Sequence, residues 1–419
     1  MRDRDLYAQI LGIRAPWCVT DVKLDTKGEE VEVVVSLEPG YETTCPTCGK
    51  AAMRYDSRRR RWRHLDTCQF RTFLSAEVPR VECPVHKILQ IRVPWAEENS
   101  RFTAMFECLV IDWLRAMGGA IAPLAAQLRL GWEEVNGIQE RAVERGLARR
   151  PAEETDQLCV DETSFKRRHD YVTVVSSSIE SKVLFVGDDR TQESLDAYFT
   201  KLTPEQLAAV ISVSMDMSAA YVASTRAHIP DADGKIAFDK FHVAKILGDA
   251  VDKVRRAENA ELMATGDKSL VRSKHFWLEN PDNMSAERWS GRFAVLRQSC
   301  LRTARAWGMK ETAMGLWDYV SKIWAEKGWR KWISWAARSR LEPMKKAART
   351  VKNHLWGILN AVVNKVTNAT AESLNSKIQR IKRAACGFRN KERFKNAIYF
   401  HLGGLDLYPG TALATHTKH

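Results

Sequence analysis

The sequence predicts an α/β core that carries a large all-helical segment and follows a β-rich module and a helical hairpin. Three observations support this fold class. Apolar strand-like runs alternate with helical stretches between residues 157 and 242. Residues 243–365 lack strand-like runs and contain nine of the 14 tryptophans. The first 95 residues combine β-like runs with clustered cysteines and arginines, and the 419 residues suffice for several domains.

The chain is strongly basic. It contains 65 Lys and Arg against 52 Asp and Glu, a net charge of +13. Such a bias favours a polyanionic partner, with nucleic acid as the first candidate and a membrane surface as the second. The N-terminal residues MRDRDLYAQI lack the apolar core of a signal peptide, and Asp112 and Arg115 interrupt the apolar stretch at 105–128. We therefore expect a cytoplasmic, nucleoid-associated protein without a membrane partner.

Residues 1–95 are expected to form a zinc-binding, DNA-binding module. A CxxC knuckle followed by glycine and a later CxxH pair have the spacing of a tetrahedral zinc site with no open position, which is structural and not catalytic. The expected ligands of this one Zn²⁺ ion are Cys45, Cys48, Cys83 and His86. His64 and Cys68 are the substitutes if a ligand, most readily His86, is misassigned. A buried cysteine beside an exposed histidine, without metal, is the alternative.

A basic run lies inside this module. Its members are Arg58, Arg59, Arg60, Arg61 and Arg63. A loop stapled by zinc would hold these guanidinium groups ready for contact with DNA phosphates. The alternative is a solvated charged loop without a ligand.

Residues 96–150 are expected to form a helix-turn-helix domain. A short helix at 124–128, a break at Leu130-Gly131 and an amphipathic helix over 132–145 give the required order. The polar face of the second helix offers residue types that read base edges in the major groove, namely Asn136, Gln139 and Arg141. Amphipathic helical hairpins that do not bind DNA show the same pattern.

Residues 157–242 contain five apolar runs. The first three are separated by short turns, and helical stretches at 193–208 and 219–228 precede the fourth and fifth. Three strands, helix, strand, helix, strand is the ribonuclease-H-like arrangement. We expect the first part of such a core at 151–242, a helical insertion at 243–365, the C-terminal core helix at 366–405 and a tail at 406–419.

Two aspartates end apolar strands of this core. Asp161 follows the run 158–160, and Asp216 follows the run 210–215. The first and fourth strands of such a sheet are neighbours, so the two carboxylates should lie side by side and favour a divalent cation over mutual repulsion. Strand alternation sends Glu162 to the opposite face, so that only one of the two adjacent acids joins the site. Single acids at strand ends more often belong to turns, so the combination carries the prediction.

A third carboxylate, Glu372, begins the helical stretch AESLNSKIQRIKRAACGF. Apolar residues recur along one face of this stretch, and basic residues fill the other. The basic residues expected to line a DNA path are Lys377, Arg380, Lys382, Arg383, Arg389 and Lys391. A solvated helix face is the alternative.

Together these blocks resemble the ISL3 family of bacterial insertion-sequence transposases over nearly the whole chain. The matching stretches are CPTCG with RRWRHLD, VDETSFKRRHDYVTVV, SMDMSAAY, DKFHVAKILGDAVDKVRR and AESLNSKIQRIKRAACGFRN. The resemblance implies a DDE transposase with Asp161, Asp216 and Glu372 as metal ligands and a helical insertion before the glutamate. His86 stands where the family usually has cysteine, and Ser373 stands where glycine is common.

Asp239 and His242 look like the Asp-x-x-His element of related DDE families. Their spacing puts both side chains on one helical face, where they support the active site or pack locally.

The resemblance implies metal-dependent cleavage and transfer of DNA strands. Two Mg²⁺ or Mn²⁺ ions would act in an in-line displacement, with Asp161 bridging both. The implied partners are double-stranded DNA, as terminal inverted repeats and target, and further copies of the chain in a homodimer or larger homo-oligomer. Two other functions stay open: a zinc and helix-turn-helix repressor with an inactive core, and a ribonuclease-H-like nuclease without strand transfer.

Overall fold

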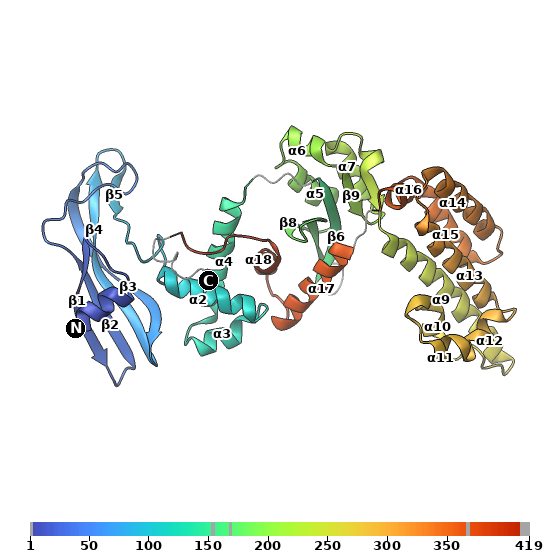
Figure 1. Ribbon diagram of the computed structural model, residues 1–419, viewed down its shortest axis with the longest axis horizontal. Helices are drawn as coiled ribbons and strands as arrows, with labels where there is room; N and C mark the ends of the chain where they lie inside the picture. Colours follow the sequence, from blue (N-terminus) through green and yellow to red (C-terminus); the bar gives the residue numbers. More distant parts are fainter. Residues whose placement is uncertain (1–2, 152–155, 167–169, 366–368, 411–419) are drawn as a thin grey trace. The chain divides into compact units, whose positions relative to one another are not determined.

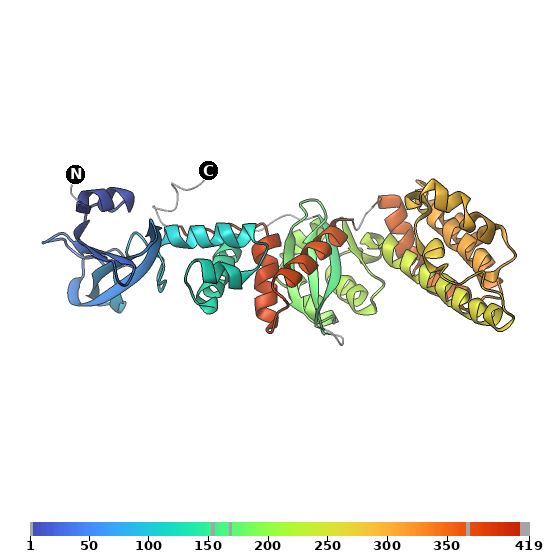
Figure 2. The same ribbon diagram turned by 90° about the horizontal axis from the view of Figure 1, so that it is seen from below.

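The computed structural model describes residues 3–151, 156–166, 170–365 and 369–410, and it divides into two units (Figures 1 and 2). Unit 1 combines Met1–Pro151 with Ile381–His419, and unit 2 comprises Ala152–Arg380. The C-terminal core segment expected at 366–405 is divided between these units, with residues up to Arg380 in unit 2 and residues from Ile381 in unit 1.

Unit 1 begins with helix α1 (Asp3–Ile10) and a twisted sheet. Its strands are β1 (Trp17–Asp25), β2 (Glu30–Leu37), β3 (Met53–Thr67), β4 (Phe70–Cys83) and β5 (Lys87–Gln90). The order is β1-β2-β4-β3, with β5 on β4, and only β2 and β4 run parallel. Val31, Val33 and Val35 are buried and alternate with the less buried Glu32 and Val34 along β2, as expected for a sheet with one covered face. The short strands and Arg-rich loops of the sequence prediction are here a long β3–β4 hairpin.

The core of this sheet centres on three tryptophans. The Trp95 ring meets the edges of Trp17 and Trp62, with ring centroids 4.9 and 5.4 Å apart. All three side chains are buried. Edge-to-face pairs of this kind stabilise a core beyond the area that they bury. The segment that contains Trp95 is thereby fixed under the sheet.

The rest of unit 1 is helical. Its elements are α2 (Ala104–Ala116), α3 (Ile121–Gln127), α4 (Trp132–Arg149) and α18 (Lys391–Leu402). The Thr103 hydroxyl accepts a hydrogen bond from Phe106 N and so caps α2. In Figures 1 and 2 α18 lies beside α4, and Phe400 and Leu407 share one core with α2–α4. A Cβ on Gly146 of α4 would lie 2.7 Å from the Leu405 Cβ, so only glycine allows this approach.

Unit 2 contains a five-stranded mixed sheet. Its strands are β6 (Gln157–Lys166), β7 (Asp170–Ser177), β8 (Val183–Asp188), β9 (Ser212–Met215) and β10 (Ile236–Phe238), in the order β10-β9-β6-β7-β8. Strand β7 is antiparallel to both neighbours, whereas β6, β9 and β10 are parallel. The order of strands and helices along the chain is the predicted one.

Four helices connect the strands of this sheet. They are α5 (Gln192–Phe199), α6 (Pro204–Ala209), α7 (Ala219–His228) and α8 (Ala232–Lys235). The single helical stretch expected at 193–208 is two helices, because Thr203 caps α6 and Pro204 begins it. Strands β9 and β10 follow α6 and α8, so both run parallel to β6 after a helical crossover.

Residues 240–365 are helical, as the absence of strand-like runs predicted. The elements are α9 (Lys240–Ala264), α10 (Lys274–Leu278), α11 (Ala286–Ser290), α12 (Arg292–Gln298), α13 (Arg302–Gly315), α14 (Lys322–Ala337), α15 (Glu342–Asn353) and α16 (Leu355–Asn364), with short 3-10 turns at Pro281–Asn283 and Leu316–Asp318. Seven of the nine tryptophans belong to the core or pack against it, whereas Trp324 and Trp335 are exposed. Helix α17 (Ala369–Ala384) follows.

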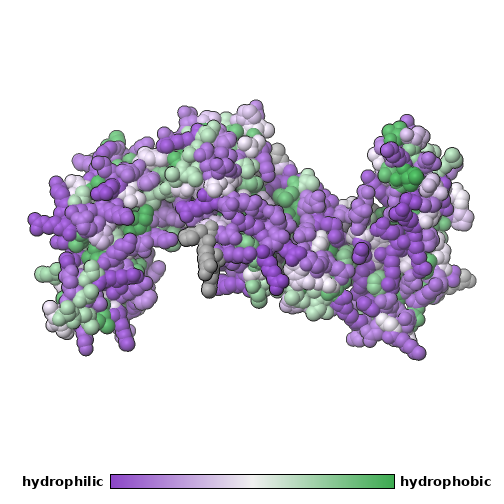
Figure 3. All heavy atoms as spheres, turned by 180° about the vertical axis from the view of Figure 1, so that it is seen from behind, coloured by the Kyte–Doolittle hydropathy of each residue, from purple (hydrophilic) through white to green (hydrophobic). Residues whose placement is uncertain are grey.

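Hydrophilic residues dominate the face that Figure 3 shows, and hydrophobic residues form only small groups there. Within the described ranges, no helix is both long and apolar enough to cross a membrane. Of the expected tail at 406–419, residues 411–419 lie outside the described residues, and Leu407 is buried in the helical core of unit 1.

Candidate active site and zinc centre

The four expected zinc ligands converge. The ligand atoms of Cys45, Cys48, Cys83 and His86 all lie within 4.8 Å of one another. The knuckle is shaped by hydrogen bonds from Cys45 N to Lys50 O and from Gly49 N to Cys45 O, with Gly49 at φ +70°. Cys83 is the last residue of β4, and the turn to β5 carries His86. Two turns on neighbouring strands therefore present two ligands each.

The geometry suits zinc. The His86 Nδ1 lies 3.6 Å from the Cys45 Sγ and 3.5 Å from the Cys83 Sγ, and the Cys48 and Cys83 sulfurs are 3.9 Å apart. Tetrahedral bonds of about 2.3 Å to sulfur and about 2.0 Å to nitrogen require ligand separations of roughly 3.5–3.8 Å. Backbone N–H groups of His86 and Val85 lower the pKa of Cys83 to about 6, which favours the thiolate that binds metal. A structural zinc site is therefore supported.

The two substitute ligands have other roles. His64 is 5% exposed, and its Nδ1 lies 2.8 Å from the Thr103 hydroxyl. Burial and the charge of Arg63 lower the pKa of His64 to about 4, so it is neutral at physiological pH. Cys68 lies in the β3–β4 turn with φ +56°, and it is exposed. Neither residue belongs to the four-ligand group.

The arginine run was expected in a loop, but it lies in β3, where the side chains alternate between the two faces of the sheet. Arg59 pairs with Glu32 at 3.1 Å and Arg61 pairs with Glu30 at 2.5 Å, so both reach across β4 to acids of β2. Arg63 is 5% exposed and pairs with Asp66. These three of the five arginines are thus neutralised within the sheet. Of the other two, Arg58 is exposed, and the Arg60 Nη1 lies 3.5 Å from the Gln90 Oε1.

The expected base-reading residues of α4 are also covered. Asn136 is 4% exposed and Gln139 is 2% exposed, and Arg141 pairs with the buried Glu107 at 2.6 Å. The expectation that Asn136 and Gln139 face outward was wrong because α4 packs against three helices, α2, α3 and α18. In a two-helix hairpin only one side of α4 would be covered, and its exposed face would be wider. The exposed positions at its start include Trp132, and Arg393 of α18 lies over that ring, 4.5 Å from the centroid.

Three aspartates line up at the carboxyl ends of the parallel strands of unit 2. In the register of β6 and β9, Cys159 is opposite Ser214, which places Asp161 opposite Asp216 two residues further on. In the register of β9 and β10, Phe238 is opposite Met215, which places Asp239 on the other side of Asp216. Neighbouring strands are about 4.8 Å apart, so the row is compact. The predicted adjacency of the first and fourth strands is confirmed.

Each carboxylate of the first pair is held by the chain itself. Asp161 accepts a hydrogen bond from the Asn375 side chain of α17 at 2.5 Å and one from Glu162 N at 2.7 Å. Asp216 accepts one from Ser218 N at 2.9 Å and one from Arg190 at 3.3 Å. The same arginine pairs with Glu162 at 2.5 Å, so Glu162 approaches the site through Arg190 and is not simply excluded by strand alternation.

Glu372 reaches the site on α17, which is docked along β6. The Asn375 bond to Asp161 and a bond from the Gln379 side chain to the Thr163 hydroxyl, 2.9 Å long, fix this helix against the strand. Glu372 is one helical turn before Asn375 and lines a cavity of about 1170 Å³ together with Asp239. The expected basic neighbours Lys377, Arg380, Arg383 and Arg389 are exposed, and Lys382 and Lys391 are partly buried.

These acids share one electrostatic environment. Burial raises the pKa of Asp161, and Asp216 and Asp239 add to the effect, whereas the Glu162 amide and His242 oppose it. Burial and the neighbouring Asp239 raise the pKa of Glu372, and His242 opposes this shift. The His242 Nε2 lies 3.9 Å from the Asp239 Oδ2. His242 lowers the pKa of both Asp161 and Glu372 and so links the two acids electrostatically. Clustered carboxylates of this kind are hard oxygen donors that suit divalent cations.

The carboxylates are less tightly gathered than the zinc ligands. In the part of the chain that the structure describes, only the cysteine and histidine group places three or more ligand atoms within 4.8 Å of one another. Asp161 and Asp216 come from neighbouring strands and Glu372 comes from α17, so three separate elements position these acids.

Several contributors escaped the sequence analysis. Asn375 and Gln379 lie three and seven residues after Glu372, on the helix face that carries it, and this spacing was the available signal. Arg190 follows the turn after β8, and nothing in its local sequence places it next to Asp216.

Comparison with known proteins identifies the class. The ISL3 transposase family matches residues 158–398, a zinc-finger of transposases IS204, IS1001, IS1096 and IS1165 matches residues 42–86, and the helix-turn-helix domain of transposase family ISL3 matches residues 91–143. Because the first match covers more than half of the sequence, the chain belongs to the ISL3 family of transposases.

Two relatives resemble the chain over most of its length. The transposase for insertion sequence element IS1557 of Mycobacterium tuberculosis is 27% identical over 427 residues, which cover 94% of this chain and 94% of that protein. The transposase for insertion sequence element IS1001 of Bordetella parapertussis is 26% identical over 373 residues, with 88% and 89% covered. The similarity therefore extends through the zinc, helix-turn-helix and transposase regions together.

Proposed function

We propose that this transposase binds the terminal inverted repeats of its insertion sequence and cleaves and joins DNA strands with Asp161, Asp216 and Glu372 as catalytic carboxylates. The observation that carries the proposal is the register of β6 and β9, which sets the two aspartates side by side beneath the helix that carries the glutamate. Membership of the transposase family supplies the reaction class.

The fold supports a ribonuclease-H-like core. Read from its outer antiparallel edge, the sheet has the order β8-β7-β6-β9-β10, with the second strand antiparallel to its neighbours. This is the arrangement that three strands, helix, strand, helix, strand produces. We assign 151–242 to its first part and the helices of 243–365 to an insertion before α17. The C-terminal part of the core then ends within α17, because residues from Ile381 pack in unit 1.

We assign a separate role to each residue of the carboxylate site. Asp161 lies on the central strand β6, next to β9 and in hydrogen-bond contact with α17, and it would hold the divalent cations together with Asp216 and Glu372. Asn375 orients the Asp161 carboxylate. Bound Mg²⁺ or Mn²⁺ ions would activate the attacking oxygen and stabilise the leaving oxygen of an in-line phosphoryl transfer.

Asp239 and His242 support the site from the start of α9. Asp239 is buried and caps this helix by accepting a hydrogen bond from Phe241 N at 3.0 Å. It is held at the end of β10 in the same row as the catalytic pair. We assign to it and to His242 the role of fixing the electrostatic environment of Asp161 and Glu372.

Double-stranded DNA is the proposed partner, with end and target segments both bound. The exposed Lys377 and Arg380 follow Glu372 on α17 and are placed to contact phosphates near the cut strand. Pairing of two ends requires a homodimer or a larger homo-oligomer. The structure does not favour a repressor with an inactive core, because all three acids are present and Asp161 and Asp216 are adjacent.

The test is incubation of the purified protein with Mg²⁺ and duplex DNA that carries an element end, followed by mapping of nicks and joints. Asp161→Asn should lower the cleavage rate at least a thousandfold, about 4 kcal/mol, because a neutral amide is a poor ligand for a hard cation. Binding to end DNA should stay within about twofold of the parent. Glu205→Gln, an exposed acid at the start of α6, is the matched control and should cleave normally. Undiminished cleavage by Asp161→Asn would refute the assignment.

A further inference from the structure

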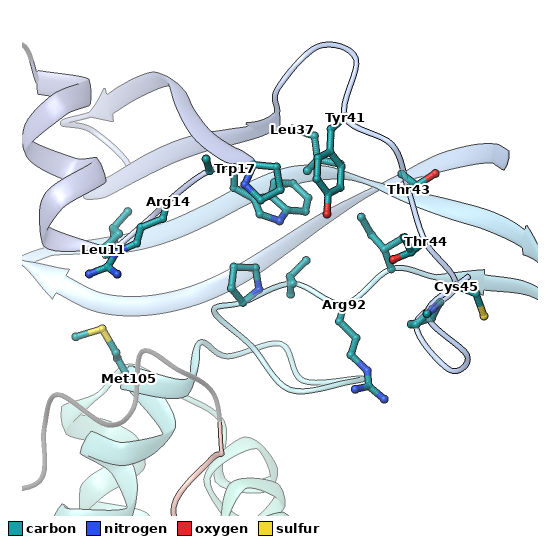
Figure 4. Close-up of a pocket in the computed structure, with 18 of the residues that line it drawn as sticks. Leu11, Arg14, Trp17, Leu37, Tyr41, Thr43, Thr44, Cys45, Arg92 and Met105 are labelled. Carbon is teal, nitrogen blue, oxygen red and sulfur yellow. The ribbon is translucent and has the colours of Figure 1, made fainter. Parts of the chain in front are cut away.

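A groove of about 860 Å³ lies beside the zinc knuckle (Figure 4). Its walls come from the end of α1, the start of β1, the arm at residues 41–46 and the segment at residues 91–94. Figure 4 shows Arg14 near Leu11 at one side and Arg92 below Thr44 and Cys45 at the other. The zinc ligand Cys45 itself lines the groove, so metal binding fixes one wall.

The charge of this groove is one-sided. The described residues that line it include no aspartate or glutamate, although the chain has 52 of them. Arg14 and Arg92 are exposed, and within residues 3–151 and the other described ranges neither forms a side-chain ion pair. Unpaired guanidinium groups without neighbouring acids create a local positive potential that attracts a polyanion.

The arginines of β3 differ in this respect. Arg59, Arg61 and Arg63 form ion pairs with Glu32, Glu30 and Asp66, respectively, in the same domain. A phosphate would have to compete with these carboxylates, whereas it would meet Arg14 and Arg92 without a competitor. The basic run of β3 is conspicuous in the sequence, but it is a weaker candidate for phosphate contact than the isolated Arg14 and Arg92.

The groove also has an apolar floor. Trp17 and Leu37 line it from the sheet and Val93 lines it from the opposite segment. Its walls are fixed, because the Thr43 hydroxyl donates to Ala52 O at 2.8 Å and Cys45 N donates to Lys50 O at 2.8 Å. A DNA strand presents the matching pattern, with charged phosphates on the outside and apolar deoxyribose faces between them.

We infer that this groove is a DNA-binding surface of the zinc domain, in which Arg14 and Arg92 pair with backbone phosphates and the apolar floor contacts the sugars. The inference rests on the proposed DNA-binding function and adds a site outside the helix-turn-helix. Phosphate contacts of this kind position a protein on DNA without reading sequence. The zinc ion then preorganises a DNA-binding wall in addition to stabilising the fold.

The experiment compares full-length variants in titrations of labelled end-containing duplex DNA at several salt concentrations. Arg14→Ala and Arg92→Ala should each weaken binding by about tenfold at low salt and reduce the slope of log affinity against log salt by about 0.9. The double variant should show both losses together. Arg4→Ala, which removes an equal charge from α1 at a residue paired with Asp21, is the matched control and should bind like the parent.

Zinc content and the thermal transition of each variant establish that the domain is folded. Parent-like affinity and slope in the folded double variant overturn the inference, and so does an equal loss in Arg4→Ala. A changed oligomeric state on size-exclusion chromatography with an unchanged salt slope also overturns it, since the groove would then be a contact between copies. If the parent binds no end DNA, the proposed function itself is refuted. If the parent binds and cleaves end DNA but the Arg14 and Arg92 variants have its affinity and salt slope, only this site is refuted.

Discussion

The four zinc ligand atoms lie within 4.8 Å of one another, whereas the proposed catalytic carboxylates Asp161 and Asp216 each accept hydrogen bonds from other groups of the chain. Two short turns bring the zinc ligands together, and hydrogen bonds from the backbone N–H groups of His86 and Val85 stabilise the Cys83 thiolate among them. Carboxylates repel one another, and those of unit 2 come from β6, β9 and α17. Asp161 accepts a hydrogen bond from Asn375, and Asp216 accepts hydrogen bonds from Ser218 N and Arg190.

The difference separates two ways of building a site. The zinc centre depends on local turn geometry, so its metal stabilises the β1–β5 sheet. The carboxylate centre depends on the packing of α17 against β6, so its geometry follows from the fold, and the metal that we propose there would supply chemistry.

The largest expected effect concerns the zinc centre. Cys83→Ser should release zinc and unfold the β1–β5 sheet, because structural zinc contributes on the order of 10 kcal/mol in small metal-stabilised domains. Zinc content and circular dichroism provide the measurement. Cys68→Ser, at the exposed cysteine outside the four-ligand group, is the control and should retain one zinc ion per chain. Full zinc content in Cys83→Ser would remove that residue from the ligand set.

A smaller effect concerns His64, which lies in the zinc domain but binds no metal in this arrangement. Its pKa in the folded chain is about 4, below the ordinary value of about 6.5. The unfolded chain therefore takes up a proton first as the pH falls, and stability present above pH 6.5 is lost progressively toward pH 4, by about 3 kcal/mol.

Unfolding free energies of the parent and of His64→Gln, measured at pH 7 and pH 5 with equal zinc content, test this prediction. The parent should lose more stability than the variant over this interval. Parallel pH profiles for the two proteins would contradict the depressed pKa of His64.

The smallest effect concerns the carboxylate centre. Asn375→Leu removes the hydrogen bond to Asp161 while preserving side-chain size, and it should lower the cleavage rate by about 10–100-fold, as expected for residues that orient metal ligands. The Mn²⁺ concentration for half-maximal rate should rise with it. Gln379→Leu removes the neighbouring α17 contact without touching Asp161 and is the matched control. Equal effects of the two variants would mean that Asn375 only docks the helix.

Part of this organisation could be predicted from the sequence because it is local. Local spacing predicts the zinc ligands Cys45, Cys48, Cys83 and His86. The apolar runs that end at Asp161 and Asp216 likewise predict that each aspartate lies at the end of a strand. Strand order then places the two aspartates together without any knowledge of side-chain packing.

The rest depends on contacts between distant segments. Asn136 and Gln139 have the polar character of an exposed face, but α4 is packed on several sides, including by α18, which follows it by more than two hundred residues. The charge of Arg59 and Arg61 is neutralised by glutamates on β2, and this pairing across β4 follows from the strand order, not from composition. Asn375 becomes a partner of Asp161 only once α17 has docked on β6.

The return of α18 to α4 has a consequence for biosynthesis. Because Phe400, Leu405 and Leu407 complete the core around α4, the helical domain of unit 1 cannot finish folding until the ribosome has translated past the codon for Glu372. A nascent or prematurely terminated polypeptide that lacks the last acid also lacks an intact DNA-reading domain.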